Sequence, residues 1–364
     1  MKRPAIFRFF QTHHQHHQGS RSRDYRIFKG NNENFMKNGA LLLEERLSLF
    51  NGITNPIRFF SVDDINAMNV DQVGMGCDGD DLYPGVWNGN LVLVKIFEDS
   101  RSSSVFGCCE IEDATPPMAC REIAVATQMG NHTNVHRLLG CCLHTFCPVQ
   151  VYEWAENGNL QDRIFRYKEH NKEALEWKER LRVAWEIAHA AAYLHTAFRR
   201  PIIHRNLKPS HVILDQDDSA RLSEFSWTVS IPEGKTYVED CDVSGTYGYI
   251  AVDYMTSRRV AKSSDVYSFG ILLLVLMSGK PAYFTTELDC GRVYLVDWVS
   301  NCCTADCVSD IVDPAINTNG VVAEELLKTL VELALRCAAA DEECRPTMVD
   351  AATQLKNMID HAIV

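Results

Sequence analysis

Residues 202–215 read Ile202-Ile203-His204-Arg205-Asn206-Leu207-Lys208-Pro209-Ser210-His211-Val212-Ile213-Leu214-Asp215, and this stretch decides the fold of the 364-residue chain. A neighbouring stretch, Arg221-Leu222-Ser223-Glu224-Phe225-Ser226, completes the pattern. Each stretch has the pattern of a short apolar strand, a polar tight turn and another apolar strand. The side chains of the two turns are therefore the first candidates for chemistry.

Together the two stretches resemble the catalytic loop and the metal-binding turn of a protein kinase, whose working pattern is H-R-D-L-x-x-x-N followed by D-F-G. The residues that match this pattern, and for which we expect a structural role, are His204, Arg205, Lys208 and Phe225. The mismatches fall on the residues that do chemistry. Asn206 replaces the catalytic-base aspartate, His211 replaces the metal-binding asparagine, and Glu224-Phe225-Ser226 replaces D-F-G.

Each replacement weakens phosphoryl transfer for a physical reason. The aspartate of a kinase accepts the substrate proton, whereas Asn206 is neutral, and loss of general-base help costs roughly 10²–10⁴-fold. His211 offers nitrogen where Mg²⁺ prefers oxygen. Glu224 adds a methylene where a shift of about 1 Å can cost on the order of 10²-fold. Because these positions change together, the sequence favours an inactive kinase over a working kinase with drifted loops.

The composition is that of an ordinary globular protein, with 46% apolar and 23% charged residues. A net charge of −12 argues against a nucleic-acid binder, which needs a basic surface. The 14 cysteines show no zinc-binding spacing, and they include the adjacent pairs Cys108-Cys109, Cys141-Cys142 and Cys302-Cys303. We therefore expect reduced thiols in a reducing compartment and no metal site.

Neither the first residues of the chain nor its most apolar run predicts a membrane anchor. Met1-Lys2-Arg3-Pro4 lacks the apolar core of a signal peptide and a glycine for myristoylation. The most apolar run, residues 269–277, is far shorter than the about 20 residues that span a bilayer, and it predicts a buried core helix. The expected location is the cytoplasm, with attachment to the plasma membrane through partners as the alternative.

Three regions are expected along the chain. Residues 1–35 predict a disordered tail, a reading that we favour over metal binding by its histidines at 13–17. Residues 36–69 predict a helical extension, which packs either on the core or on a partner. Its expected helix at 38–50 has one face formed by Leu42, Leu43, Arg46, Leu49 and Phe50. Residues 70–360 predict an α+β, bilobal kinase-like domain, with a β-rich N-lobe at about 70–153 and a helical C-lobe at about 154–360.

The glycine-rich segment predicts weak nucleotide binding. Gly74, Gly76 and Gly79 spell G-x-G-x-x-G, but this motif is a weak signal by itself. The following residues 82–85 place these glycines one residue out of step with the glycine loop of kinases. Carboxylates at Asp78, Asp80 and Asp81 would repel phosphate oxygens where a working loop offers backbone N–H groups.

Three more residues belong to the expected nucleotide site. Lys95 ends an apolar strand at the position of the V-A-I-K lysine, and Glu122 lies in a helix where it is expected to pair with that lysine. Glu153 begins the expected hinge, Glu153-Trp154-Ala155. We regard Lys95, Glu122 and Glu153, with the three glycines, as a vestigial site.

The segment after the degraded D-F-G resembles an activation segment. Its candidate residues are Thr236, Tyr237, Ser244, Thr246 and Tyr247. Ala251-Val252-Asp253 stands where A-P-E usually stands, and Asp253 is expected to pair with Arg345. Asp265 opens the central apolar helix and is expected to be structural.

Over about residues 70–358 the chain resembles plant receptor-like protein kinases of the wall-associated-kinase branch. The specific pieces are Leu138-Leu139-Gly140-Cys141-Cys142, Tyr193-Leu194-His195 and Asp265-Val266-Tyr267-Ser268-Phe269-Gly270. The sequence shows no ectodomain, so it resembles the receptor-like cytoplasmic kinases. The segment 55–60 and the degraded catalytic loop make it similar to the ZED-type (ZRK) pseudokinases.

This resemblance implies an adaptor of plant innate immunity. Such a protein links a nucleotide-binding leucine-rich-repeat receptor to pathogen effectors or to effector-modified active kinases of the receptor-like cytoplasmic group. The alternatives are a weakly active Ser/Thr kinase and an ATP-binding signalling switch. No cofactor is expected, weak ATP binding stays open, and Mg²⁺-dependent binding is disfavoured. The sequence identifies neither the partners nor the surfaces that dock them.

Overall fold

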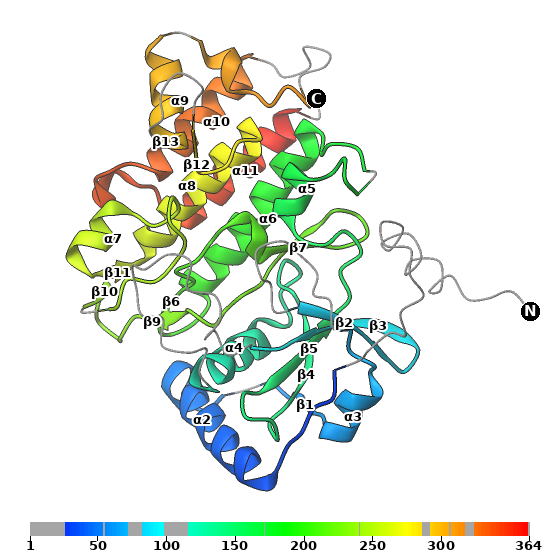
Figure 1. The fold of residues 1–364 in the computed structure, drawn as a ribbon. Helices are drawn as coiled ribbons and strands as arrows, with labels where there is room; N and C mark the ends of the chain where they lie inside the picture. The colour runs from blue at the N-terminus through cyan, green and yellow to red at the C-terminus, as the bar shows by residue number, and fades with distance from the viewer. Residues whose placement is uncertain are drawn as a thin grey trace, which may run out of the picture.

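The computed structural model describes residues 26–53, 55–71, 82–97, 116–170, 172–239, 241–285, 292–305, 307–316 and 324–362. A smaller lobe built around a sheet and a larger lobe of helices lie one above the other (Figure 1). The α+β, bilobal class predicted from the sequence is therefore confirmed.

The N-lobe contains a five-stranded sheet in the order β1-β4-β5-β3-β2. Its strands are β1 (Arg58–Phe59), β2 (Leu82–Trp87), β3 (Asn90–Lys95), β4 (Leu138–Cys142) and β5 (Val149–Glu153). Strands β2 and β3 form a hairpin because Asn88 and Gly89 adopt the positive φ values of 50° and 80° that a tight turn of this kind needs. Strand β1 pairs in parallel with β4. Residues 58–59, which the sequence places in the extension, are thus part of the sheet.

Two helices flank this sheet, α3 (Val62–Ala67) and α4 (Pro116–Met129). A capping box formed by Ser61 and Asp64 starts α3. Helix α4 buries Glu122 together with the apolar side chains of its inner face. This helix therefore delivers a carboxylate into the interior beside β3.

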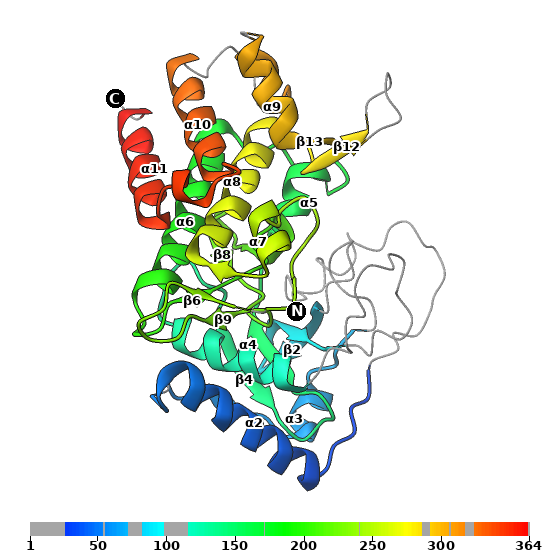
Figure 2. The same ribbon diagram turned by 90° about the vertical axis from the view of Figure 1, so that its left-hand side faces the viewer.

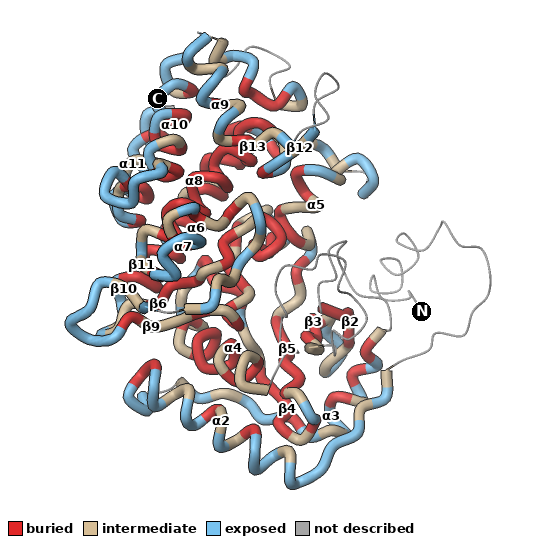
Figure 3. Tube along the Cα trace, turned by 60° about the vertical axis from the view of Figure 1, so that its left-hand side comes forward, coloured by how far each residue is buried: buried red, intermediate tan, exposed pale blue. Residues whose placement is uncertain are grey.

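The C-lobe is mostly helical. Its helices are α5 (Leu160–Phe165), α6 (Trp177–Thr196), α7 (Val252–Ser257), α8 (Lys262–Ser278), α9 (Leu295–Thr304), α10 (Glu324–Cys337) and α11 (Met348–Ala362), with 3-10 turns at Pro209–His211, Val308–Ile311 and Glu342–Cys344. Helix α8 is buried along nearly its whole length, as the red tube in Figure 3 shows. It ends at Gly279, whose φ of 62° is the left-handed conformation of a helix cap.

Short strand pairs connect these helices. They are β6 (Ile202–Ile203) with β9 (Val229–Ser230), β7 (Val212–Leu214) with β8 (Ala220–Leu222), β10 (Tyr237–Val238) with β11 (Val260–Ala261), and β12 (Tyr283–Thr285) with β13 (Arg292–Tyr294). The hairpin of β7 and β8 carries the degraded metal-binding turn at its end. Single bridges of Leu222 to Val135, ahead of β4, and of Ile213 to Asn159, ahead of α5, attach this hairpin to segments of both lobes.

Helix α2 (Asn32–Phe50) runs along α4 on the outside of the N-lobe (Figure 2). Asn31 caps its first turn, and Asn51 ends it with a φ of 52°. It begins inside the 1–35 segment predicted as tail, and the Asn31 amide donates to the His144 carbonyl at 2.9 Å. Residues 1–25 of that predicted tail, with the histidines at 13–17, lie outside the described residues.

The predicted apolar face of α2 is wrong at one residue. Leu42, Leu49 and Phe50 are buried, whereas Leu43 is 57% exposed and lies on the outer side of the helix. At its C-terminal end, α2 also reaches the C-lobe. The Phe50 ring meets Phe198 edge-on at 5.2 Å, and Arg200 donates to the Ser48 carbonyl at 2.9 Å.

Two further expectations concern the cysteines and the membrane. Every cysteine in the described part of the chain has a free thiol. Among the helices that the structure describes, none combines the length and the apolar character needed to cross a bilayer.

Candidate functional site

One ammonium group is shared by two carboxylates between the lobes. Lys95 at the end of β3 places its Nζ 2.6 Å from Glu122 Oε2 and 2.6 Å from Glu224 Oε2. The side chain of Lys95 is 2% exposed and that of Glu122 is 1% exposed, whereas that of Glu224 is 21% exposed. The predicted pair of Lys95 and Glu122 is present. The second carboxylate, at the position of the D-F-G aspartate, was not expected there.

Burial and the charge of Lys95 give the carboxyl groups of Glu122 and Glu224 very different pKa values. Burial raises the pKa of Glu122 to about 7, even though Lys95 and the Tyr152 hydroxyl act in the other direction. Burial also opposes ionisation of Glu224, but the charge of Lys95 and its hydrogen bond lower that pKa to about 2. Burial lowers the pKa of Lys95, and its two carboxylates more than compensate and raise it. Lys95 and Glu224 therefore form a charged pair at neutral pH.

The catalytic loop is anchored as a kinase-like loop would be. Asp265 at the start of α8 accepts hydrogen bonds of 2.8 Å from the His204 amide, the Arg205 amide and His195 Nε2. His204 Nε2 donates to the Ser223 carbonyl at 2.9 Å, which joins the loop to the turn that carries Glu224. Burial raises the pKa of Asp265, but these donors outweigh it and lower the pKa.

The side chain at the catalytic-base position already accepts a hydrogen bond from a neighbouring residue. The Thr246 hydroxyl donates to Asn206 Oδ1 at 2.8 Å, and Asn206 is 8% exposed. An amide oxygen that already accepts this bond is a poor proton acceptor. The loop therefore holds a polar group at the right place without the basicity that the reaction needs.

His211 is fixed by the same loop. Its Nδ1 lies 2.8 Å from the Asn206 carbonyl, which only accepts, so Nδ1 carries the proton. Burial, with the nearby charge of Lys208, lowers the pKa of His211 to about 3, and the ring is neutral. A metal at this position would meet an imidazole nitrogen and a glutamate already bonded to Lys95. These residues do not fit Mg²⁺, which takes oxygen ligands in near-octahedral geometry.

The turn that carries Glu224 has a left-handed residue followed by two buried residues. Glu224 itself has a φ of 65°, and Phe225 is 1% exposed with its ring edge-on to His204 at 5.6 Å. Ser226, at the glycine position, is 3% exposed. Within the described residues, no group of three or more His, Cys, Asp or Glu side chains is arranged to hold a metal ion.

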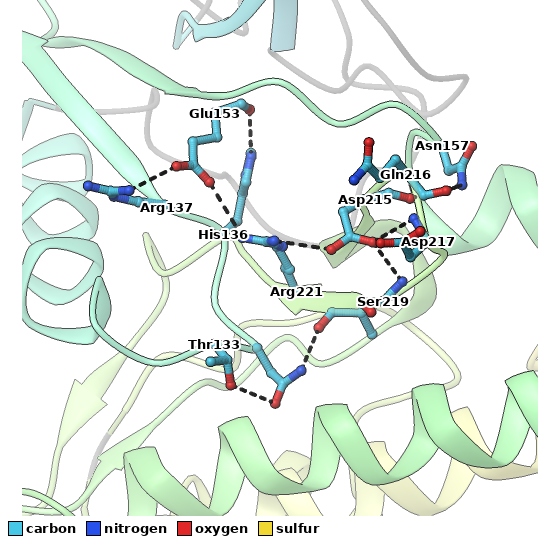
Figure 4. A network of polar contacts seen from close by, with 12 residues as sticks. Thr133, His136, Arg137, Glu153, Asn157, Asp215, Gln216, Asp217, Ser219 and Arg221 are labelled. Carbon is cyan, nitrogen blue, oxygen red and sulfur yellow. Dashed lines mark hydrogen bonds and ion pairs between the residues drawn. The ribbon is translucent and has the colours of Figure 1, made fainter.

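The side chain of Glu153 forms ion pairs with two arginines. It pairs with Arg137 at 3.1 Å and with Arg221 at 3.4 Å, and Arg221 continues to Asp215 at 3.1 Å (Figure 4). This ion-pair chain joins the hinge to both lobes. The role predicted for Glu153 in a vestigial nucleotide site stays a prediction. Gly74, Gly76 and Gly79, with Asp78, Asp80 and Asp81, lie outside the described residues.

Two residues near the hinge escaped the sequence analysis. The Tyr152 hydroxyl donates to Glu122 Oε1 at 3.0 Å and lies 2.7 Å from Gln150 Oε1. His136 lies with its ring stacked on that of Tyr152, at a centroid distance of 4.9 Å. A buried tyrosine in a strand and a buried histidine just ahead of one carry no motif, and only their long-range contacts show that they belong to the site.

Arg205 holds the activation segment through direct hydrogen bonds. Its guanidinium donates to the Trp227 carbonyl at 3.3 Å, to the Asp242 carbonyl and to the Tyr254 hydroxyl at 2.7 Å. The Ser244 amide donates to the same hydroxyl at 3.0 Å. The backbone of the segment is thereby tied to the catalytic loop.

The candidate residues of the activation segment differ in exposure. Thr236 and Tyr247 are exposed, whereas Tyr237, Ser244 and Thr246 are half-buried. Tyr237 lies in β10 opposite Ala261 of β11. Beyond the segment, Asp253 pairs with the fully buried Arg345, as the sequence predicted.

Comparison with known proteins identifies the family. The model of the protein tyrosine and serine/threonine kinase family matches residues 92–355. The chain belongs to this family.

Individual relatives narrow the assignment. The serine/threonine-protein kinase ZRK1 of Arabidopsis thaliana is 35% identical, over 89% of this chain and 92% of its own length. The non-functional pseudokinase ZED1 of the same plant is 36% identical, over 88% of this chain and 95% of its own length. The wall-associated receptor kinase-like 6 is 37% identical over 68% of this chain and 38% of its own length. The chain is thus a ZED-type (ZRK) member within the wall-associated-kinase-like branch.

Proposed function

We propose that this chain is a pseudokinase, a kinase fold that works through its surfaces. One observation carries the proposal. Asn206 accepts a hydrogen bond from Thr246 at the position of the catalytic base, inside a loop whose anchor on Asp265 is complete. The scaffold that positions a catalytic base is present, but the side chain at that position is an amide, which is not basic.

The proposed role is that of an adaptor in plant innate immunity, in the cytoplasm. Its partners would be a nucleotide-binding leucine-rich-repeat receptor on one side, and pathogen effectors or effector-modified kinases on the other. ZED1 and ZRK2, the latter 33% identical, are named non-functional pseudokinases, which supports the loss of catalysis. The partners are those that the family resemblance implies.

The outer face of α2 is the surface that we assign to partner binding. Met36, Leu43 and Leu47 are 70%, 57% and 54% exposed, and their spacing places them along one side of the helix. The opposite side is already buried against α4. The pale-blue outer side of α2 in Figure 3 shows this division. An apolar stripe that the domain itself leaves uncovered fits a partner interface.

A second candidate function is that of a Ser/Thr kinase with residual activity. The retained pair of Lys95 and Glu122 favours it, and ZRK1 is named a serine/threonine-protein kinase. The two functions differ in a simple assay, since only the second requires transfer of phosphate from ATP.

Affinity purification from plant tissue tests the adaptor. The double variant Leu43→Glu/Leu47→Glu should lose the receptor, while Val349→Glu, a matched change at an exposed apolar residue of α11, should keep it. We assign the activation segment as a second partner surface, and Tyr247→Ala, at an exposed residue of that segment, tests it. If the α2 variant stays folded by circular dichroism and still retains every partner, the assignment of this face is wrong.

A further inference from the structure

The hinge carbonyl of Glu153 is already used by a side chain of the N-lobe. His136 Nε2 lies 2.9 Å from this carbonyl oxygen, and because a carbonyl only accepts, Nε2 carries the proton. The Glu153 amide donates to the Arg137 carbonyl at 3.1 Å. Both backbone polar groups of this hinge residue are therefore committed to the segment that leads into β4.

The His136 ring is fixed in this position. It is 2% exposed and lies nearly parallel to the Tyr152 ring, at an interplanar angle of 18°. Burial lowers its pKa to about 4, with Arg221, Glu224 and Lys95 close enough for their charges to act on it. The ring is thus neutral at physiological pH, and it is bonded to the hinge while lying close enough to Lys95 and Glu224 to be affected by their charges.

The other end of the cleft is filled in a comparable way. In a kinase, the lysine at the position of Lys95 holds nucleotide phosphates. Here Glu224 Oε2 lies 2.6 Å from its Nζ, a short charge-assisted hydrogen bond. A phosphate oxygen would have to displace this carboxylate, and the two anions would repel each other.

We propose that the chain occupies its own nucleotide cleft, with His136 taking the place of the purine at the hinge and Glu224 taking the place of the phosphate at Lys95. An adenine amino group would have to share the Glu153 carbonyl with the His136 N–H, whose ring lies against this hinge residue. The two residues therefore set the specificity of the cleft against purine nucleotides. The inference rests on the proposed pseudokinase function and gives it a structural cause.

Adenosine tests the hinge end by itself, since it carries no phosphate. His136→Val removes both the donor and most of the ring, and it should bind adenosine about tenfold more tightly than the wild type, the effect of roughly one buried hydrogen bond. His136→Gln keeps an N–H donor of similar reach and should stay as weak as the wild type. His189→Val, the same change at an exposed histidine of α6, is the control for a general effect of losing an imidazole.

ATP tests the phosphate end. Glu224→Asp shortens the side chain by one methylene and should strengthen binding of ATP, but not of adenosine, in calorimetric titrations of the full chain. The double variant His136→Val/Glu224→Asp should bind ATP most tightly. If His136→Val fails to fold, His136→Leu, which keeps more of the volume, replaces it.

The proposal is overturned if wild-type protein binds adenosine as tightly as His136→Val or His136→Leu. It is also overturned if His136→Gln gains as much affinity as His136→Val, because the donor would then be irrelevant. Either result leaves the adaptor function intact as long as the receptor still co-purifies. Loss of the receptor from unaltered protein would instead count against the adaptor function alone.

Discussion

The Thr246 hydroxyl lies 2.8 Å from Oδ1 of Asn206 and donates a hydrogen bond to it. This contact links the activation segment to the catalytic loop at the residue where a kinase keeps its base. It satisfies the Asn206 amide oxygen in a nearly buried position, so the loop is stable with a group that cannot take a proton.

Restoring the base alone should not restore catalysis. We expect the wild type to show no transfer of labelled phosphate to itself or to a generic substrate, and Asn206→Asp to behave in the same way. The reason is that His211 and Glu224 still misplace the metal, and catalytic groups acting as a unit are strongly non-additive. Robust incorporation by Asn206→Asp that disappears when Lys95→Met is added would show that only the base was missing.

The inner and outer faces of α2 should respond differently to truncation. Leu42→Ala, at a residue 3% exposed, should lower the free energy of unfolding by about 2–5 kcal/mol because it leaves a cavity against α4. Leu43→Ala, at the neighbouring residue 57% exposed, should change it by no more than about 0.5 kcal/mol. Urea denaturation measures both. Equal losses from the two variants would mean that α2 does not pack as the structure shows.

The charge of Glu224 should make stability depend on pH in the acid range. Its pKa is about 2 in the folded protein against an ordinary value of 4.5, so the unfolded chain binds this proton more tightly. The stabilisation is fully present above pH 4.5 and is lost as the pH falls toward about 2.

Replacing Glu224 with glutamine should therefore flatten the decline of unfolding free energy over that range. Urea denaturation at successive pH values measures the slope, and Glu169→Gln, at a surface residue of an ion pair with Arg166, serves as the control. A slope for Glu224→Gln that equals the slope of the wild type would exclude the charged pair with Lys95 as its source.

The pair of Asp253 and Arg345 should matter more than a surface pair. The Arg345 side chain is fully buried and Asp253 is 28% exposed, so Asp253→Ala leaves a buried cation without its carboxylate. We expect a loss of about 1.5–3 kcal/mol. Asp360→Ala, which breaks the exposed pair with Lys356, should cost less than about 1 kcal/mol. Similar melting temperatures for the two variants would argue against a structural role for Asp253.

The local sequence pattern was sufficient to predict elements that are formed by neighbouring residues. The apolar run at 269–277 predicted the buried helix α8, and the turn residues around His204 and Glu224 predicted the catalytic frame. The pairs of Lys95 with Glu122 and of Asp253 with Arg345 followed from family spacing. The partners of these two pairs are far apart in the sequence, so the family resemblance was needed to predict them.

Other features depend on geometry that no window of sequence contains. Leu42 and Leu43 are equally apolar neighbours, and only the packing of α2 on α4 separates the buried one from the exposed one. His136 and Glu153 are brought together by the pairing of β4 with β5. Lys95 and Glu224 are 129 positions apart in the sequence, and only the fold brings them into contact.

The contacts of α2 with both lobes have a mechanical consequence. The helix lies along α4, and its last turn meets Phe198 and Arg200 of the C-lobe. It therefore connects α4 of the N-lobe to the residues that follow α6 in the C-lobe, and moving the lobes apart on this side would break the contacts at its end. A partner that binds the outer face of α2 therefore binds an element that contacts both lobes, and it can affect their relative position.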